Sequence, residues 1–153
     1  IPLLELEDGN RLSESNAILN YLAWGTSLLG TSRFEIPKVQ QWQFFEQYSH
    51  EPFIAVARFI AKYLGLPESK KAEYEAKQAG GHKALAVMES QLAQTSFLTG
   101  QGVTAADVSL YGYTHVAHEG GFNLSLYPNV QAWLSRIEAL PNYIAMDASK
   151  GKA

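Results

Sequence analysis

The sequence contains no cysteine. That absence excludes a disulfide-stapled scaffold, a thiolate metal site and a cysteine nucleophile within these 153 residues. Histidine is also scarce, with four in the chain. His115 and His118 lie three positions apart and Glu119 follows, but no third ligand stands out and the zinc-protease order His-Glu-x-x-His is absent. We therefore expect no metal site.

The chain also lacks an excess of positive charge. Twelve basic residues stand against fifteen acidic ones, for a formal net charge of -3, and the largest basic cluster is Lys70-Lys71. Proteins that bind nucleic acids usually present a basic face to the phosphates. Long apolar runs are missing too, since a stretch such as 53–57 is far too short to span a bilayer. We expect a cytoplasmic protein with no nucleic-acid partner and no membrane association.

What is present is a globular composition, with 46% apolar and 18% charged residues. The length suits one domain, or one domain and a fragment of another. Residues 1–27 carry strand and turn signals and then a short helix pattern. Residues 28–37 mix small and polar residues without periodicity and indicate a linker. Residues 38–153 have helical periodicity, so the pattern predicts a mostly α chain of the α+β class.

The opening segment predicts a β-hairpin followed by a helix. Near alternation over 3–7 suits a strand, Asp8-Gly9-Asn10 signals a tight turn, and 11–13 forms the short returning strand. Ser13 and Ser15 are both reasonable caps for the helix that follows. Two strands and one short helix do not normally form a stable unit alone, so this segment needs further structure to pack against.

The remainder predicts four helices. Pro52 lies inside the first and should kink or break it, because proline removes a backbone donor and clashes with the preceding turn. Gly80-Gly81 is a weak point in the second. Trp42 and Trp133 fall at helical spacing with other apolar residues and are expected in the core. The predicted segments are 38–64, 68–94, 104–119, and one from Pro128 to just before Pro141.

The third helix has the sharpest start signal in the chain. Thr104 and Asp107 have the spacing of a capping box, in which each side chain satisfies an orphan backbone N–H of the other residue. Val103 and Val108 have the spacing of the accompanying hydrophobic staple. We expect Thr104 and Asp107 to be structural and to take no part in chemistry, and loss of either to cost about 1 kcal/mol.

These motifs together resemble the glutathione transferase family over nearly the whole chain. The segments before the first helix, and Ser15-Asn16-Ala17-Ile18-Leu19 at its start, are similar to the second half of the family's amino-terminal domain. The later segments are similar to its helical domain, and the resemblance is closer to bacterial members. The matching stretches are 1–4, 8–9, 12–19, 97–100, 103–107, 127–130 and Trp133.

The resemblance implies an incomplete thioredoxin-like domain, the hairpin and its helix, followed by an all-α carboxy-terminal domain. The sequence begins at Ile1-Pro2, so the strand, helix and strand that come first in the family are not among these residues. In the family that segment supplies the serine, tyrosine or cysteine that activates the glutathione sulfur. We therefore assign no catalytic residue.

The resemblance also implies a glutathione site. Ser15 would hold the carboxylate of the γ-glutamyl group at a helix start, where free N–H groups and the helix dipole favour an anion, and Glu14 would hold its amine. From the local sequence alone, a helix cap is the favoured role of Ser15, and only the family resemblance favours glutathione binding. Ile1 would offer its backbone groups to the cysteinyl unit next to a cis bond at Pro2, in a strand-like pairing.

A second, hydrophobic substrate would bind between the two domains. Tyr48, His50, Phe53 and Tyr111 are the candidates for lining that pocket, although aromatic residues at helical spacing are more often part of a core. The expected function is conjugation of the glutathione thiolate to a hydrophobic electrophile by a homodimer, with glutathione as co-substrate. A glutathione-dependent peroxidase or disulfide reductase on the same fold, and a non-catalytic protein-interaction module, are the alternatives.

Overall fold

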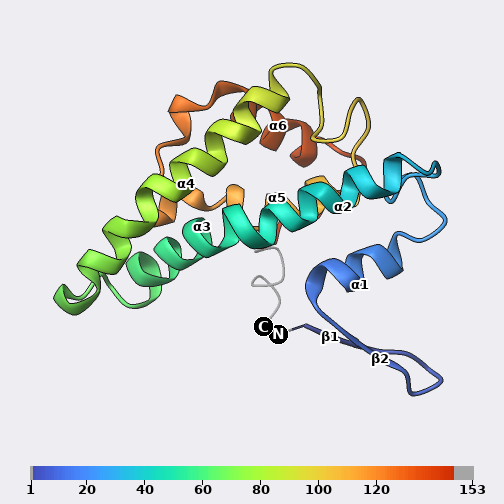
Figure 1. Cartoon of the computed structure of the whole chain (residues 1–153), viewed down its shortest axis with the longest axis horizontal. Coiled ribbons are helices and arrows are strands. Elements are labelled where there is room, and N and C mark those ends of the chain that lie inside the picture. Colours follow the sequence, from blue (N-terminus) through green and yellow to red (C-terminus); the bar gives the residue numbers. More distant parts are fainter. Residues whose placement is uncertain (1, 147–153) are drawn as a thin grey trace.

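The computed structural model describes residues 2–146 and contains a two-stranded antiparallel sheet followed by a bundle of helices (Figure 1). The mostly α fold expected from the sequence is thereby confirmed. Within the described residues, no helix combines the length and hydropathy of a membrane span. The strands are β1 (Leu3–Glu5) and β2 (Arg11–Ser13), and the α-helices are α1 (Ser15–Leu22), α2 (Glu35–Phe45), α3 (Glu51–Arg58), α4 (Lys71–Leu92), α5 (Ala105–Thr114) and α6 (Pro128–Glu138).

The hairpin forms as expected, although its first strand ends two residues early. Leu3 pairs with Ser13 and Glu5 with Arg11 in antiparallel register, and the Glu5 and Arg11 side chains form an ion pair at 2.8 Å. Gly9 in the turn has a φ of 85°, a left-handed conformation that glycine adopts without steric cost. The hairpin extends away from the helical bundle beyond α1 (Figure 1).

Helices α2 and α3 continue along nearly one line (Figure 1), although Pro52 lies near the start of α3. The expected break does not occur. Instead, Glu46–His50 form a turn of π-helix between the two helices. Because proline lacks an N–H and crowds the preceding turn, this local widening lets the chain remain helical through Pro52. A second π-helical turn, Phe59–Tyr63, follows α3.

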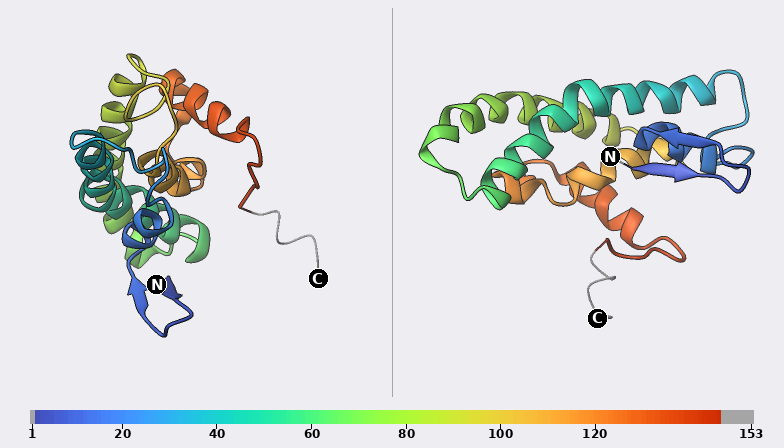
Figure 2. Two further views of the ribbon diagram at one scale, coloured as in Figure 1. Left: turned by 90° about the vertical axis from the view of Figure 1, so that its right-hand side faces the viewer. Right: turned by 90° about the horizontal axis from the view of Figure 1, so that it is seen from below.

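The hydrophobic core forms around α5, which has α2 and α3 on one side and α6 on the other (Figure 2). Ala105 and Ala106 begin this helix and are both buried, and their small side chains let the neighbouring elements approach closely. Trp42 and Trp133 are 6% and 0% exposed, which confirms their predicted place in the core. The bulkiest fully buried side chains around them are Phe122, Ile54, Ile60, Leu85, Met88, Leu98 and Leu110.

The glycine pair in α4 is not a weak point, because α4 runs unbroken through it. A Cβ at Gly80 would lie 2.2 Å from the Phe53 ring, and one at Gly81 would lie 2.3 Å from the Phe122 ring. Both distances are far below van der Waals contact. The two glycines therefore allow two aromatic rings to pack directly on the helix backbone, which offsets their poor helix propensity.

The expected capping box is present at the start of α5, but Asp107 does more than cap. Its fully buried carboxylate accepts from the Thr104 N–H at 2.8 Å, the Thr104 hydroxyl at 3.0 Å, the Leu98 N–H at 2.9 Å and the Trp133 indole N–H at 2.9 Å. Burial raises the pKa of this carboxyl, and the donors oppose that shift. The Asp107 carboxylate thus joins the loop before α5, through Leu98 and Thr104, to helix α6, through Trp133.

Candidate functional site

A cleft of about 890 Å³ lies between α1 and the helical bundle. Ser15, Asn16 and Leu19 of α1 line one part of it, and the exposed side of α5 lines another. The cleft therefore brings the amino-terminal unit and the helical unit together at one surface, and it contains the expected glutathione residue Ser15. This cleft is the candidate functional site.

The start of α1 has an unusual backbone. Glu14 precedes the helix with φ 69° and ψ 118°, although it is not glycine. Such conformations are strained and are retained mainly where a site requires them. Ser15 is the first helical residue, and no side-chain hydrogen bond caps the start of α1 among the described residues. The absence of that hydrogen bond does not support the alternative that Ser15 serves only as a helix cap. The side chains of Glu14 and Ser15 are both exposed, so a ligand can reach them.

The other half of the expected glutathione site is only partly described. Ile1, whose backbone groups were expected to pair with the ligand, lies outside the described residues, and with it the bond to Pro2. Pro2 itself is exposed beside β1. The roles of Ile1, Pro2, Glu14 and Ser15 in binding glutathione stay predictions.

A partly buried polar network, which the sequence pattern did not predict, fixes α1 against the bundle. The Asn16 amide donates to the Glu46 carboxylate at 3.2 Å and accepts from the Ser109 hydroxyl at 2.7 Å. One turn later, Asn20 and Gln43 exchange two amide hydrogen bonds at 2.9 and 2.8 Å. Residues four positions apart lie on the same face of a helix, so the spacing of Asn16 and Asn20 was the feature of the sequence that could have indicated a polar contact on one face of α1.

Glu46 is the titratable member of this network. It is 4% exposed and borders the cleft. Burial raises the pKa of its carboxyl, while hydrogen bonds from Gln47 and Asn16 lower it and the nearby Glu51 raises it further. Hydrogen bonds from Asn16 and Gln47 therefore hold the Glu46 carboxyl in place where α1 meets the cleft.

The four residues expected to line a second-substrate pocket do not come together. His50 is fully buried, with Nε2 2.8 Å from the Thr114 hydroxyl, so it is a core residue. Phe53 packs against α4 at Gly80. Tyr48 is 82% exposed and is not among the residues that line the cleft. The π-helical turn before Pro52 sets these directions, and no simple helical count could give them.

Tyr111 alone of the four lines the cleft. Its hydroxyl lies 2.6 Å from that of Tyr143 and donates to Glu138 at 3.2 Å. Burial and these neighbours raise its pKa, so the phenol stays protonated. His115 stacks on its ring with 4.7 Å between centroids. Within residues 2–146 no three His, Asp or Glu side chains gather in a metal-binding group.

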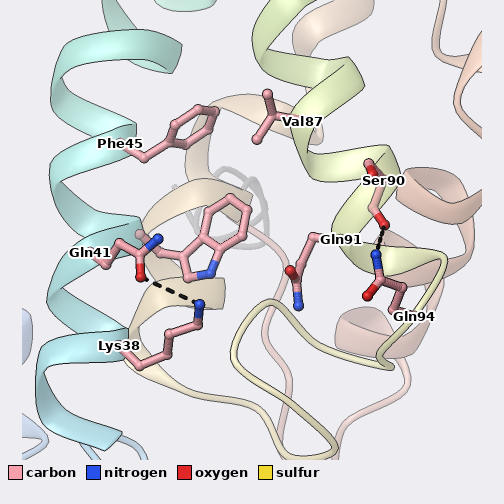
Figure 3. Close-up of a pocket in the computed structure, with 8 residues that line it drawn as sticks. Lys38, Gln41, Phe45, Val87, Ser90, Gln91 and Gln94 are labelled. Atoms are coloured by element: carbon pink, nitrogen blue, oxygen red, sulfur yellow. Dashed lines mark hydrogen bonds between the residues drawn. The ribbon is translucent and has the colours of Figure 1, made fainter. Parts of the chain in front are cut away.

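A smaller groove of about 340 Å³ lies between α2 and α4 (Figure 3). Its lining combines Phe45 and Val87 with several amide side chains, and Lys38 donates to Gln41 at 3.3 Å near its edge (Figure 3). The groove contains none of the residues expected to bind glutathione. The cleft beside α1 therefore remains the candidate functional site.

Comparison with known proteins identifies the family to which this chain belongs. Residues 29–141 match the family described as "Glutathione S-transferase, C-terminal domain". The match covers most of the chain, and the chain belongs to the glutathione S-transferase family. The structure is similar to that of a glutathione S-transferase from Pseudomonas fluorescens, with a TM-score of 0.94 and 56% identity over 95% of this chain and 73% of that chain.

Two curated relatives are more distant. Elongation factor 1-gamma of Artemia salina is 30% identical over 87% of this chain but only 31% of its own length. Glutathione S-transferase F10 of Arabidopsis thaliana is 33% identical over 71% of this chain and 54% of its own length. The chain therefore spans about a third of the first relative and about half of the second, and the similarity extends both to transferases and to a translation factor.

Proposed function

We propose that the protein is a glutathione transferase that joins the glutathione thiolate to a hydrophobic electrophile. The observation that carries this proposal is the strained Glu14 followed by Ser15 at the start of α1, both exposed beside a cleft of about 890 Å³. Family membership supports the same reading. We assign no residue of this chain to the sulfur atom.

Glutathione would enter with its γ-glutamyl group at the start of α1. The first N–H groups of a helix have no intrahelical acceptor, and the helix dipole adds a partial positive charge there. The Ser15 hydroxyl is a further donor for the ligand's carboxylate, and the Glu14 carboxylate is a partner for its amine. The network of Asn16 with Glu46 and Ser109 would hold this helix start in place.

The electrophile would lie against the α5 side of the same cleft. Tyr111 is the one predicted pocket residue that lines this cleft, and Val108 and Gly112 line the same side. These groups form an apolar stretch next to polar ones such as Ser109, and small-molecule pockets usually combine apolar walls with a few polar groups. The protonated hydroxyl of Tyr111 stays hydrogen-bonded to Tyr143 and Glu138. Tyr111 would therefore contribute mainly its ring to the binding of the electrophile.

We further propose a cytoplasmic homodimer. Phe44, Tyr48 and Trp24 are 63%, 82% and 75% exposed, and exposed aromatic side chains of this size are often covered by a partner. A glutathione-dependent peroxidase or disulfide reductase remains the alternative on this fold, and its product would be glutathione disulfide instead of a conjugate.

The similarity to elongation factor 1-gamma favours a second candidate, a non-catalytic module that binds other proteins. The two candidates differ in glutathione binding, which the Glu14-Ser15 geometry supports and a pure interaction module does not need. Titration calorimetry of the intact protein with glutathione separates them, because only the transferase requires saturable binding.

The decisive comparison is Ser15→Ala against Ser13→Ala. Both serines are exposed and lie two positions apart, but only Ser15 borders the cleft. Loss of a hydrogen bond to a carboxylate should weaken glutathione binding by about ten-fold or more in Ser15→Ala, with little change in Ser13→Ala. Equal affinities in the two variants would show that glutathione binds elsewhere, and absent binding in the unaltered protein would favour the module.

A further inference from the structure

A cluster of three charged side chains lines part of the same cleft. The Arg58 Nε donates to one oxygen of the Glu119 carboxylate at 2.5 Å, and the Lys62 ammonium pairs with the other oxygen. These two hydrogen bonds hold the pKa of Glu119 down at about 2. Two cations thus share a single carboxylate, and the cluster keeps one positive charge in excess.

The cluster is built into the fold. Glu119 lies in the 3-10 turn Ala117–Gly120, which packs on α3. A Cβ at Gly120 would lie 2.9 Å from the Arg58 backbone nitrogen, so a larger residue would push the turn and its carboxylate away. The Tyr63 ring supports both cations, with Arg58 Cζ 5.3 Å and Lys62 Nζ 5.9 Å from its centroid.

The ion pairs with Glu119 use only part of the donor set of the two cations. Arg58 carries five N–H donors and Lys62 three, and the ion pairs with Glu119 use one of each. The other two carboxyls of the cleft already accept hydrogen bonds from neighbouring side chains, Glu46 from Asn16 and Gln47, and Glu138 from Tyr111. An anionic group that enters the cleft is therefore attracted to the part lined by Arg58 and Lys62.

We propose that Arg58 and Lys62 bind a carboxylate of the electrophile, so that the protein selects aromatic electrophiles carrying an acid group. This inference rests on the proposed function, because it names the substrate class of that cleft. Glu119 is a positioning residue, which orients the two cations. Glutathione itself offers a second carboxylate on its glycyl end, and the experiment must distinguish the two sources.

Binding gives the first measurement. 3,5-Dinitrobenzoate and its neutral isostere 3,5-dinitrobenzamide are titrated into the intact protein by calorimetry. We expect the benzoate to bind about three- to ten-fold more tightly, as for a partly exposed charged hydrogen bond. Lys62→Gln should abolish that preference and Lys62→Glu should reverse it. Lys83→Gln removes the same charge from an exposed position of α4 that lines no part of the cleft, and it should keep the preference.

Turnover gives the second measurement, with 4-chloro-3,5-dinitrobenzoate and the corresponding amide. In both reactions the thiolate sulfur bonds to the ring carbon, chloride leaves with the bonding electrons, and the thiol proton goes to solvent. After division by the uncatalysed rates, the ratio of kcat/KM for acid over amide should fall about three- to ten-fold in Lys62→Gln and stay constant in Lys83→Gln.

Equal binding of benzoate and benzamide to the unaltered protein would overturn the inference. So would a rise in the KM of glutathione in Lys62→Gln that is the same with both electrophiles, because the bound carboxylate would then be that of glutathione. Selective benzoate binding that depends on Lys62, without turnover of either chloride, would sustain the anion site and refute the transferase function.

Discussion

Asn16 of α1 and Ser109 of α5 are 93 positions apart in the chain, and their side chains meet at 2.7 Å. The Asn16 amide also reaches the buried Glu46 at 3.2 Å. The helix whose start carries Ser15 is therefore fastened to the bundle one residue further on. Any movement of α1 relative to α5 must first break this contact.

The first prediction concerns this contact. Asn16→Ala should destabilise the protein by about 1–2 kcal/mol, because the buried Glu46 loses one of its two side-chain donors and the Ser109 hydroxyl loses this acceptor. Ser109→Ala should cost less, and the double variant should cost less than the two single losses together, by about 0.5 kcal/mol or more. Urea unfolding of the four proteins measures this coupling.

The same variants should weaken glutathione binding although neither side chain is expected to touch the ligand. Asn10→Ala in the hairpin turn is a suitable control, since Asn10 bonds only to the neighbouring Asp8 among the described side chains. Additive stability losses, or unchanged glutathione affinity in Asn16→Ala, would mean that the network does not position α1.

The second prediction concerns the pH dependence of stability. Burial lowers the pKa of His50 to about 4 from its ordinary value of 6.5. Between these pH values the His50 imidazole is protonated in the unfolded chain but stays uncharged in the folded protein. Stability must therefore fall as the pH drops from about 6.5 to about 4, by up to about 3 kcal/mol.

A variant isolates this effect from other titrating groups. His50→Gln should lose the acid sensitivity in that window relative to the unaltered protein, whereas His118→Gln, at an exposed position, should keep it. Urea midpoints recorded between pH 7 and pH 4 provide the comparison. Parallel pH profiles for the unaltered protein and His50→Gln would contradict the burial of an uncharged His50.

The third prediction separates the two members of the capping box. Thr104→Ala removes one side-chain partner and should cost about 1 kcal/mol. Asp107→Ala leaves the Leu98 and Thr104 N–H groups and the Trp133 indole without their acceptor. We expect a cost of about 3–5 kcal/mol, visible in thermal unfolding and in the fluorescence of Trp133. Similar costs for the two variants would show that Asp107 acts only as a cap.

Local sequence determined much of the fold because the signals involved neighbouring residues. The Asp8-Gly9-Asn10 turn, the Thr104 and Asp107 capping box, and the apolar helical stripe of Trp133 each depend on a few adjacent positions. The family motifs around Ser15 are equally local, and Ser15 lines the cleft. Such features form in the same way wherever their flanking elements form.

Tertiary structure decided the rest. The π-helical turn before Pro52 rotated His50 into the core and Tyr48 toward solvent, and helical spacing alone could not anticipate that extra residue in the turn. Gly80 and Gly81 are poor helix formers by their sequence, but the Phe53 and Phe122 rings pack on the backbone that they leave uncovered. Asn16, Glu46 and Ser109 come together across long separations, and so do Arg58 and Glu119. Their contacts depend on how helices pack, and helix packing depends on the whole core at once.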